Sequence, residues 1–485
     1  IRDRLTACDL QEEPYGFYSD DNFYKSETDA ESGLLYAYNA LTFLEYSRGI
    51  FYIGDIPTET MSPKSDEAGD VYQLENWIAN RETEQLQYYF KYCYIAINRA
   101  NTVIDHIQNS SALSETARRR ILGEAYFLRA WNYFNLVRTF GIVPVQTQMV
   151  AELSQTTPPM ATGLDQLYDL IFGDLTRADN LLEVNKVFGR ADKVAAQSLM
   201  AKAYLTIASS KEHNVHRYTE MRREPRIMYD SAAYWAGKVV RDYRDSYDFD
   251  TDLRAIYDVD KPTGPEHIFI MPIDRSGTQE GNYSKLPLLF LPSNNSVPFY
   301  IRYGNGDLQR ANGNGWGVFL CNDEFVETQF STTDKRRTEL IHRDIYDASG
   351  NPIVPNQVKG YFSSKYVDPD FIGERTSARP YLIRFSDIAL VYAEAAGPEA
   401  GLAYVNRIRE RAGVTPLPSG MTTDKFREAV IKERALELAF EGNRLYDLRR
   451  TASVTTTDIK AAGLSEAEAA YYPIPQREID LNPNL

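Results

Sequence analysis

The sequence predicts a mainly α-helical fold in which helix pairs stack into a superhelical scaffold, interrupted by one large irregular region with short strands. Apolar residues recur every three or four positions through most of residues 1–245 and again after residue 385, as in helices with one buried face. Between these parts, Gly, Pro, Asn and Asp are too frequent for long helices. Each helix pair has an apolar face that it cannot cover alone, so neighbouring pairs are expected to stack.

The N-terminal part, residues 1–245, is predicted to consist of helix pairs. The periodic segments are 28–48, 85–107, 115–140, 164–183, 191–209 and 229–243. Ser114 is a natural N-cap for the segment 115–140, and Gly141 is a natural end. Leu122-Gly123, followed by Tyr126 and Ala130, is similar to part of a tetratricopeptide repeat, a helix–turn–helix unit. We therefore expect tetratricopeptide-like pairs.

The middle part, residues 246–385, is predicted to be irregular and to face a ligand. Turn residues are dense there, as in Asn312-Gly313-Asn314-Gly315-Trp316-Gly317, and only short strands fit, at His267–Met271 and Tyr381–Phe385. Long irregular segments on a rigid scaffold are where binding residues usually lie.

The C-terminal part, residues 386–485, is predicted to return to helices and to complete the same fold. Ser386 can cap a helix over 387–396, a second helix covers 399–412, and Asp424 can cap a long helix that runs to about Arg450. The tail beyond Tyr472 is rich in Pro and is expected to be extended.

A row of carboxylates lies in this C-terminal part. Glu433, Glu437 and Glu441 follow one another at four-residue spacing, so on a helix they would form one stripe whose like charges repel. We expect a structural network in which cations neutralise the stripe. The candidate cations are Arg384, Arg407, Arg409, Arg434, Arg444, Arg449 and Arg450. The alternative is a carboxylate site for a metal ion or for acid–base chemistry.

Composition restricts the function. The formal net charge is −15, which disfavours nucleic-acid backbones and anionic lipid as partners. Three cysteines far apart and only five His, without metal-ligand spacing, predict neither a disulfide scaffold nor a zinc site. Nucleophile-elbow and phosphate-loop motifs are absent. We therefore expect no cofactor, no metal and no catalysis. With 68 Asp and Glu residues, some pair must lie at the carboxylate spacing of a glycoside hydrolase by accident, so their number is no evidence for one.

Two segments combine aromatic faces with polar side chains, the combination that a sugar ring requires. The candidate carbohydrate-binding residues are Tyr72, Asn76 and Trp77 in one segment, and Tyr300, Arg302, Tyr303, Asn314 and Trp316 in the other. We predict that Trp77 and Trp316 are exposed and lie on the same side of the molecule. The alternative is that either indole packs in the core, as we expect for Trp131 and Trp235, which lie in helical segments.

Several segments, taken in order, resemble a known family. They are Glu124–Trp131 with its continuation to Pro144, Ile383–Asp387 with its continuation to Arg409, Glu433–Leu438 with its continuation to Arg449, and Tyr472-Pro473-Ile474-Pro475, with Arg99-Ala100-Asn101 as a weaker match. In order and spacing they resemble the helical core and C-terminal signature of the SusD/RagB family.

The resemblance implies a lipoprotein on the exterior of the outer membrane. Such a protein captures oligo- or polysaccharides and delivers them to a TonB-dependent outer-membrane transporter, which it covers as a lid. The resemblance also suggests that loops before the first repeat helices and in the irregular part form the glycan platform. A peptide- or protein-binding helical-repeat module is the alternative function, followed by a glycoside hydrolase.

A lipid anchor is the expected membrane attachment. No run of about 18 apolar residues would cross a bilayer as a helix. Leu5-Thr6-Ala7-Cys8 reads like the end of a bacterial lipobox, with Cys8 as the lipid-bearing residue, but the preceding apolar run is missing. The alternative is that Cys8 is incidental and that the anchor lay upstream.

Overall fold

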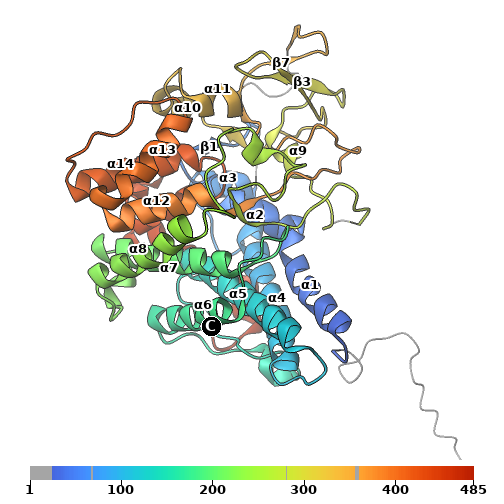
Figure 1. Ribbon diagram of the computed structural model, residues 1–485, viewed down its shortest axis with the longest axis vertical. Helices are drawn as coiled ribbons and strands as arrows, with labels where there is room; N and C mark the ends of the chain where they lie inside the picture. The colour runs from blue at the N-terminus through green and yellow to red at the C-terminus, as the bar shows by residue number, and fades with distance from the viewer. Residues whose placement is uncertain (1–23, 67–68, 280, 355–359) are drawn as a thin grey trace, which may run out of the picture.

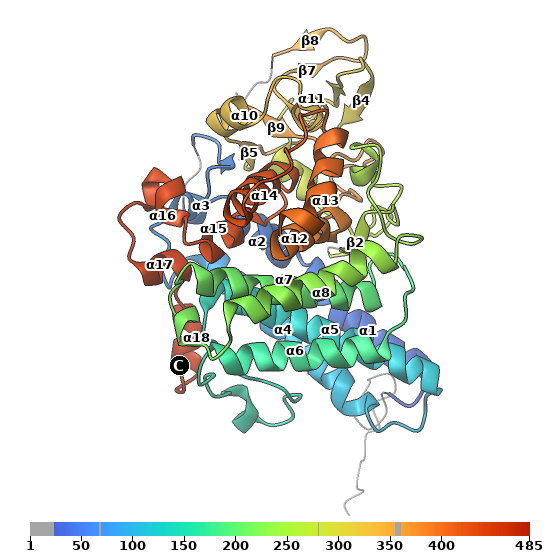
Figure 2. The same cartoon turned by 60° about the vertical axis from the view of Figure 1, so that its left-hand side comes forward.

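The computed structural model describes residues 24–66, 69–279, 281–354 and 360–485 (Figure 1). Its N-terminal part is built from helices, as predicted. They are α1 (Glu27–Thr42), α2 (Leu44–Gly54), α3 (Asp70–Glu75), α4 (Glu84–Ile107), α5 (Glu115–Phe140), α6 (Leu164–Leu181), α7 (Lys193–Glu212) and α8 (Pro225–Asp242). Successive long helices from α4 to α8 pack on one another and form a stack (Figure 2). The tetratricopeptide-like scaffold is thereby confirmed.

Helix ends follow local chemistry where the sequence signals are strong. The Ser114 hydroxyl accepts the Ala117 N–H at the start of α5, and Gly141 ends this helix with φ +77°. The single helix predicted over 28–48 is wrong, because Phe43 adopts extended backbone and separates α1 from α2. The break lets the Phe43 ring pack on Tyr92 of α4, with ring centroids 5.2 Å apart.

The middle part carries short strands and short helices above the helical stack (Figure 1). The strands are β2 (His267–Ile270), β3 (Phe299–Arg302), β4 (Leu308–Ala311), β5 (Leu320–Cys321), β6 (Ile341–His342), β7 (Ile345–Tyr346), β8 (Pro352–Ile353), β9 (Phe362–Ser363) and β10 (Tyr381–Arg384), and the helices are α9 (Leu286–Phe290), α10 (Asp323–Gln329) and α11 (Lys335–Leu340). The two strands expected from the sequence, β2 and β10, pair with each other antiparallel.

The C-terminal helices return to the scaffold. They are α12 (Phe385–Ala396), α13 (Pro398–Arg411), α14 (Thr423–Glu437), α15 (Arg444–Arg450), α16 (Val454–Thr457), α17 (Glu466–Ala470) and α18 (Gln476–Leu481). Helix α12 packs against α7 and α8, so this part continues the N-terminal stack (Figure 2). Three predicted details are wrong: Thr422 rather than Asp424 caps α14, Ser386 lies inside α12, and α14 stops at Glu437 instead of running to Arg450.

The end of α14 is forced by a contact with the N-terminal part. Phe440 and Gly442 have φ of +65° and +75°, which ends the helical path. A Cβ on Gly442 would lie 2.3 Å from Cγ2 of Ile50, so only glycine fits there. The Gly442 N–H donates to the buried carboxylate of Asp55, at 2.6 Å. The turn thus joins α2 to the C-terminal helices.

The predicted carboxylate network exists and is buried. Glu433 binds Arg336 and Arg409 at 2.6 and 2.5 Å, and Glu437 binds Arg411 at 2.7 Å. Glu441 lies beyond the end of α14, so the three carboxylates do not share one helix.

Arg384 connects these carboxylates with a fourth one. Its Nη1 lies 2.6 Å from Glu266 and 3.3 Å from Glu437, and its Nε lies 2.8 Å from Glu441. Burial alone would raise the pKa of Glu266, but Arg411 and Arg384 outweigh it and lower this pKa to about 2.

The other predicted cations find different partners. Arg434 and Arg450 share Asp447 on α15, and Arg444 binds Glu59, which lies after α2. The cations that the sequence did not suggest are Arg336, Lys365 and Arg411. The structural interpretation of the carboxylates is therefore confirmed, with a different set of cations.

Asp55 gives a prediction for pH-dependent stability. Burial raises its pKa to about 7, whereas an unfolded chain has an Asp pKa of about 3.9. The folded protein therefore binds this proton more tightly, and stability falls as the pH rises from about 4 to 7. An amide at this position can still accept the Gly442 N–H but carries no charge. We expect Asp55→Asn to be more stable than the wild type at pH 8, by on the order of 1–3 kcal/mol.

Thermal melts of both proteins at pH 5 and pH 8 test this prediction. The melting temperature of the variant relative to the wild type should be higher at pH 8 than at pH 5. An equal or smaller difference at pH 8 would contradict the assignment of a raised pKa to Asp55.

Candidate functional site

The loop that carries Trp316 is held rigidly by its own backbone. The Trp316 N–H donates to the Leu288 carbonyl at 2.5 Å, and the Gly317 N–H donates to the Leu291 carbonyl at 3.0 Å. A Cβ on Gly315 would lie 2.0 Å from the Leu291 carbonyl oxygen. Glycine is therefore needed for the loop to lie directly on the chain after α9. With its backbone pinned there, the indole of Trp316 is 39% exposed.

The neighbourhood of Trp316 combines apolar and polar groups. A Cβ on Gly313 would lie 1.9 Å from the Val297 carbonyl, and the Asn312 amide donates to the Gly373 carbonyl at 2.7 Å, so residues 297 and 373 border the loop. Among the exposed side chains at these borders are Val297 and Ile372. The buried Oδ1 of Asn314 has no hydrogen-bond partner within the described part of the chain. The exposed indole offers the apolar face that a sugar ring needs, and Asn314 lies two residues before it in the same loop.

Strand β3 presents its two predicted site residues, Tyr300 and Arg302, outward. Phe299 and Ile301 point into the core, whereas Tyr300 is half-buried and Arg302 is exposed. The Arg302 guanidinium lies 4.2 Å from the centre of the Tyr346 ring on β7 and donates to the Gly350 carbonyl at 2.5 Å. The cation is therefore held against the sheet, where it can still face a ligand.

Tyr303 does not meet the prediction. It is buried, its hydroxyl donates to the Gln309 side chain, and its ring packs edge-on against His342 with centroids 5.4 Å apart. Because its hydroxyl and its ring both serve the fold, Tyr303 is a core residue of the small sheet.

The prediction that Trp77 is exposed is also wrong. Trp77 follows α3 with φ +57°, and only 8% of its surface is exposed. Its indole stacks on Tyr472, with ring centroids 6.2 Å apart, and the indole N–H donates to Asp458 at 3.4 Å. The C-terminal part of the chain therefore encloses Trp77, which no local sequence signal could reveal.

The rest of the Trp77 segment is more open. Tyr72 is 52% exposed, and Asn76 is half-buried with its amide donating to the Tyr72 carbonyl at 2.9 Å. Strand β1 (Met61–Ser62), which precedes this segment, pairs antiparallel with β5, which follows the Trp316 loop, with Ser62 opposite Leu320. Tyr72 and Asn76 remain candidates, without Trp77.

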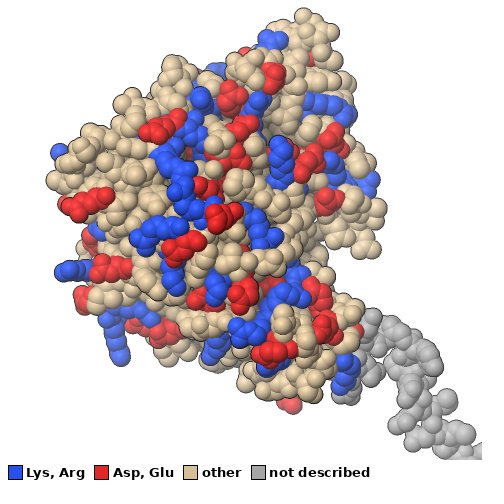
Figure 3. All heavy atoms as spheres, viewed as in Figure 1, with Lys and Arg blue, Asp and Glu red and all other residues tan. Residues whose placement is uncertain are grey.

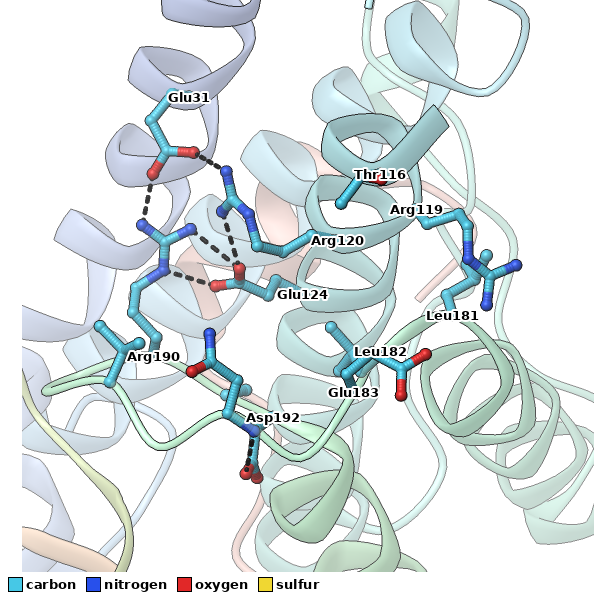
Figure 4. Close-up of a pocket in the computed structure, with 13 residues that line it drawn as sticks. Glu31, Thr116, Arg119, Arg120, Glu124, Leu181, Leu182, Glu183, Arg190 and Asp192 are labelled. Carbon is cyan, nitrogen blue, oxygen red and sulfur yellow. Dashed lines mark hydrogen bonds and ion pairs between the residues drawn. The ribbon is translucent and has the colours of Figure 1, made fainter. Parts of the chain in front are cut away.

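A separate pocket of about 540 Å³ lies between α1, α5 and the loop after α6 (Figure 4). Its centre holds a closed square of charges, in which Arg120 and Arg190 each bind both Glu31 and Glu124. These groups neutralise one another, and none of the predicted site residues lines this pocket. Its charges join three scaffold elements and are not free for a ligand.

Metal-ligand clusters, cysteine pairs and membrane-spanning helices were each sought among the described residues. No group of three metal-ligating side chains occurs among them, and Cys93 and Cys321 are free and buried. None of the helices resolved in these ranges has the length and apolarity to cross a bilayer. Figure 3 shows basic and acidic residues interspersed on one face, without a basic patch for nucleic acid. Cys8, the predicted lipid-bearing residue, lies outside the described residues.

Two family models each match one part of the chain. Residues 344–485 match the model described as the SusD family, and residues 24–205 match the model described as starch-binding associating with outer membrane. The first match also includes the last part of the irregular region, and neither match includes the Trp316 loop.

Curated relatives extend over most of the chain. SusD-like protein P2 of Formosa agariphila is 25% identical and covers 92% of this chain and 88% of its own length. A SusD-like protein of Bacteroides ovatus is 24% identical, with coverage of 92% and 80%.

Solved structures share the fold. A laminarin-binding SusD-like protein superposes with a TM-score of 0.76 at 22% identity, covering 95% of this chain and 98% of that chain. Surface glycan-binding protein A from Bacteroides thetaiotaomicron, solved in complex with laminarihexaose, gives a TM-score of 0.73 at 20% identity, covering 94% and 97%.

Proposed function

Because this chain belongs to the SusD/RagB family, we propose that it is a cell-surface protein that captures oligo- or polysaccharides. The observation that carries the proposal is the Trp316 loop, whose glycines fix the backbone and leave the indole open beside Asn314, whose amide oxygen has no partner among the described residues. Tyr300, Arg302, Tyr72 and Asn76 are the further candidate contacts. The structural neighbours that bind laminarin and laminarihexaose support the ligand class.

The proposed partner is a TonB-dependent transporter of the outer membrane. The family model that matches residues 24–205 describes association with the outer membrane, which supports this location. A lipid anchor would hold the protein on the exterior face, and the captured glycan would pass to the transporter.

The proposed action is binding without turnover. The carboxylates that gather in the C-terminal part are buried in ion pairs with Arg and Lys, so they are unsuited to protonate a glycosidic oxygen. Incubating the pure protein with any polysaccharide that it retains should release no reducing ends. Sustained release by the pure protein would show that it is a hydrolase.

Trp316→Ala should abolish most of the glycan affinity and leave the fold intact. Trp316 is 39% exposed and its side chain makes no hydrogen bond within the described residues, so the free energy of unfolding should change by less than about 0.5 kcal/mol. Loss of a central aromatic contact typically costs about 2 kcal/mol or more, which is over tenfold in the dissociation constant. The measurement is calorimetric titration against a panel that includes laminarin, starch and xylan, with a peptide panel in parallel.

Tyr234→Ala is the matched control. Tyr234 is an exposed aromatic residue on α8, outside the irregular part, so its removal should not change glycan binding. Wild-type affinity in Trp316→Ala would remove this residue from the site, and binding of peptides alone would favour the peptide-binding alternative.

A further inference from the structure

We propose that the chain has a second carbohydrate-binding site, in a cleft of about 780 Å³ between α10, α14 and α16. This inference rests on the proposed function, because the ligand class is the same. The cleft is lined by residues from five parts of the chain: residues 56–62 after α2, residues 322–329 at α10, one face of α14, Arg444 of α15, and residues 453–460 around α16. Figure 2 shows α10, α14 and α16 on the same side of the molecule.

Helix α14 forms one wall of the cleft. Glu428, Ile431, Lys432, Ala435 and Leu436 line it at three- and four-residue spacing, so one face of the helix is turned to the cleft. The wall is apolar near the core, where Ala435 and Leu436 are buried, and polar at the rim, where Glu428 and Lys432 are exposed. Met61 and Phe325 supply further apolar surface. This layering suits a sugar, whose ring face is apolar and whose edge carries hydroxyls.

An incompletely satisfied ion pair lies in the cleft wall. Both the Nε and the Nη2 of Arg444 bind the same oxygen of Glu59, Oε1, at 2.8 and 2.5 Å. The other oxygen, Oε2 of Glu59, and Nη1 of Arg444 are buried without a partner within the described ranges. A side-on fork, with Nε and Nη2 each bound to a different oxygen, would have satisfied Oε2. The pair thus keeps one acceptor and one donor without a partner. A hydroxyl group can donate to the first and accept from the second.

Further polar groups of the cleft have no partner in the described structure. The side chains of Thr457, Glu428 and Lys432 make no hydrogen bond or ion pair there. The Ser62 hydroxyl accepts a hydrogen bond from the Asn322 amide, and its O–H donates to no described residue. The positive and negative charges of the lining are nearly balanced. The acidic residues are Glu59, Glu324, Glu428 and Asp458, and the basic residues are Lys432, Arg444 and Lys460. A neutral polyhydroxyl ligand fits this balance better than an anionic one. The pocket of Figure 4 differs, because its central charges neutralise one another.

The cleft is distinct from the Trp316 face, and the fluorescence of Trp77 can report on its occupancy. Trp316 does not line it, and Asp458 in its wall accepts the indole N–H of Trp77 at 3.4 Å. A ligand that contacts Asp458 should therefore change the emission of Trp77 without touching Trp316.

The test uses full-length Trp316→Ala protein and four hexasaccharides: laminarihexaose, maltohexaose, cellohexaose and xylohexaose. At least one should alter tryptophan emission and slow hydrogen–deuterium exchange in residues 56–62, 428–436 and 453–460. Adding Lys432→Glu or Thr457→Val should weaken this binding about fivefold, as expected for one lost hydrogen bond. Lys425→Glu, an exposed lysine on α14 that does not line the cleft, should leave the affinity unchanged.

The outcomes separate this proposal from the proposed function. If the wild type binds a hexasaccharide but Trp316→Ala shows no protection of the cleft segments, the second site does not exist and glycan capture stands. Protection of these segments by peptides alone would likewise exclude a second carbohydrate site. If neither protein binds any glycan of the polysaccharide and hexasaccharide panels, both proposals are overturned.

Discussion

Arg384→Met should lower the free energy of unfolding by about 3–5 kcal/mol. The side chain of Arg384 is 1% exposed and binds Glu266 at 2.6 Å, Glu441 at 2.8 Å and Glu437 at 3.3 Å. Methionine fills much of the volume but supplies no charge, so three buried carboxylates lose the cation that they share. Uncompensated buried charge is among the most destabilising changes in proteins. Chemical denaturation at pH 7 measures the loss.

Arg407→Met is the matched control for this variant. Arg407 binds Asp248 at 3.0 Å, but its side chain is 39% exposed, and exposed pairs contribute only about 0–1 kcal/mol. The two variants remove the same group from different depths. Glycan affinity measured well below the melting temperature should be unchanged in both. If Arg384→Met melts like the wild type and instead loses glycan binding, the carboxylate cluster is a functional site and the structural interpretation is wrong.

Much of the helical scaffold could be predicted because its apolar periodicity is local. The segments 85–107 and 115–140 coincide with α4 and α5 within one residue. Helix α4 contains a regular stripe of core residues, whereas α5 is buried on nearly all sides from Ile121 onward and is delimited by Ser114 and Gly141. The helix predicted from 424 to 450 failed for the opposite reason. Its break at Phe440 and Gly442 is fixed by Asp55 and Ile50, almost 400 residues earlier, so the sequence around the break still reads as helix.

The same distinction applies to the candidate sites. Trp316 could be predicted to be exposed because the glycines around it lie in its own loop and offer no local side chains to cover it. The cleft at α14 could not be found from the sequence, since the segments that line it come together only in the fold. Local chemistry thus predicts the loop around Trp316 and the ends of α5, whereas burial by distant segments requires the structure.

Trp77→Ala should lower the free energy of unfolding by about 3–5 kcal/mol, as large-to-small changes of buried aromatic residues do. The change removes the ring that stacks on Tyr472 and the N–H that binds Asp458, so it separates the loop after α3 from the C-terminal tail. Trp77→Phe retains an aromatic ring against Tyr472 and should recover a large part of the stability. Thermal and urea unfolding of both variants, beside Trp316→Ala, measure the contrast between an enclosed and an open indole. Since Asp458 also lines the cleft, sugar binding by Trp77→Ala at low temperature should persist on the Trp316 face even if the cleft site weakens. A Trp77→Ala protein as stable as the wild type would show that this indole is not enclosed in solution, and would return Trp77 to the glycan platform.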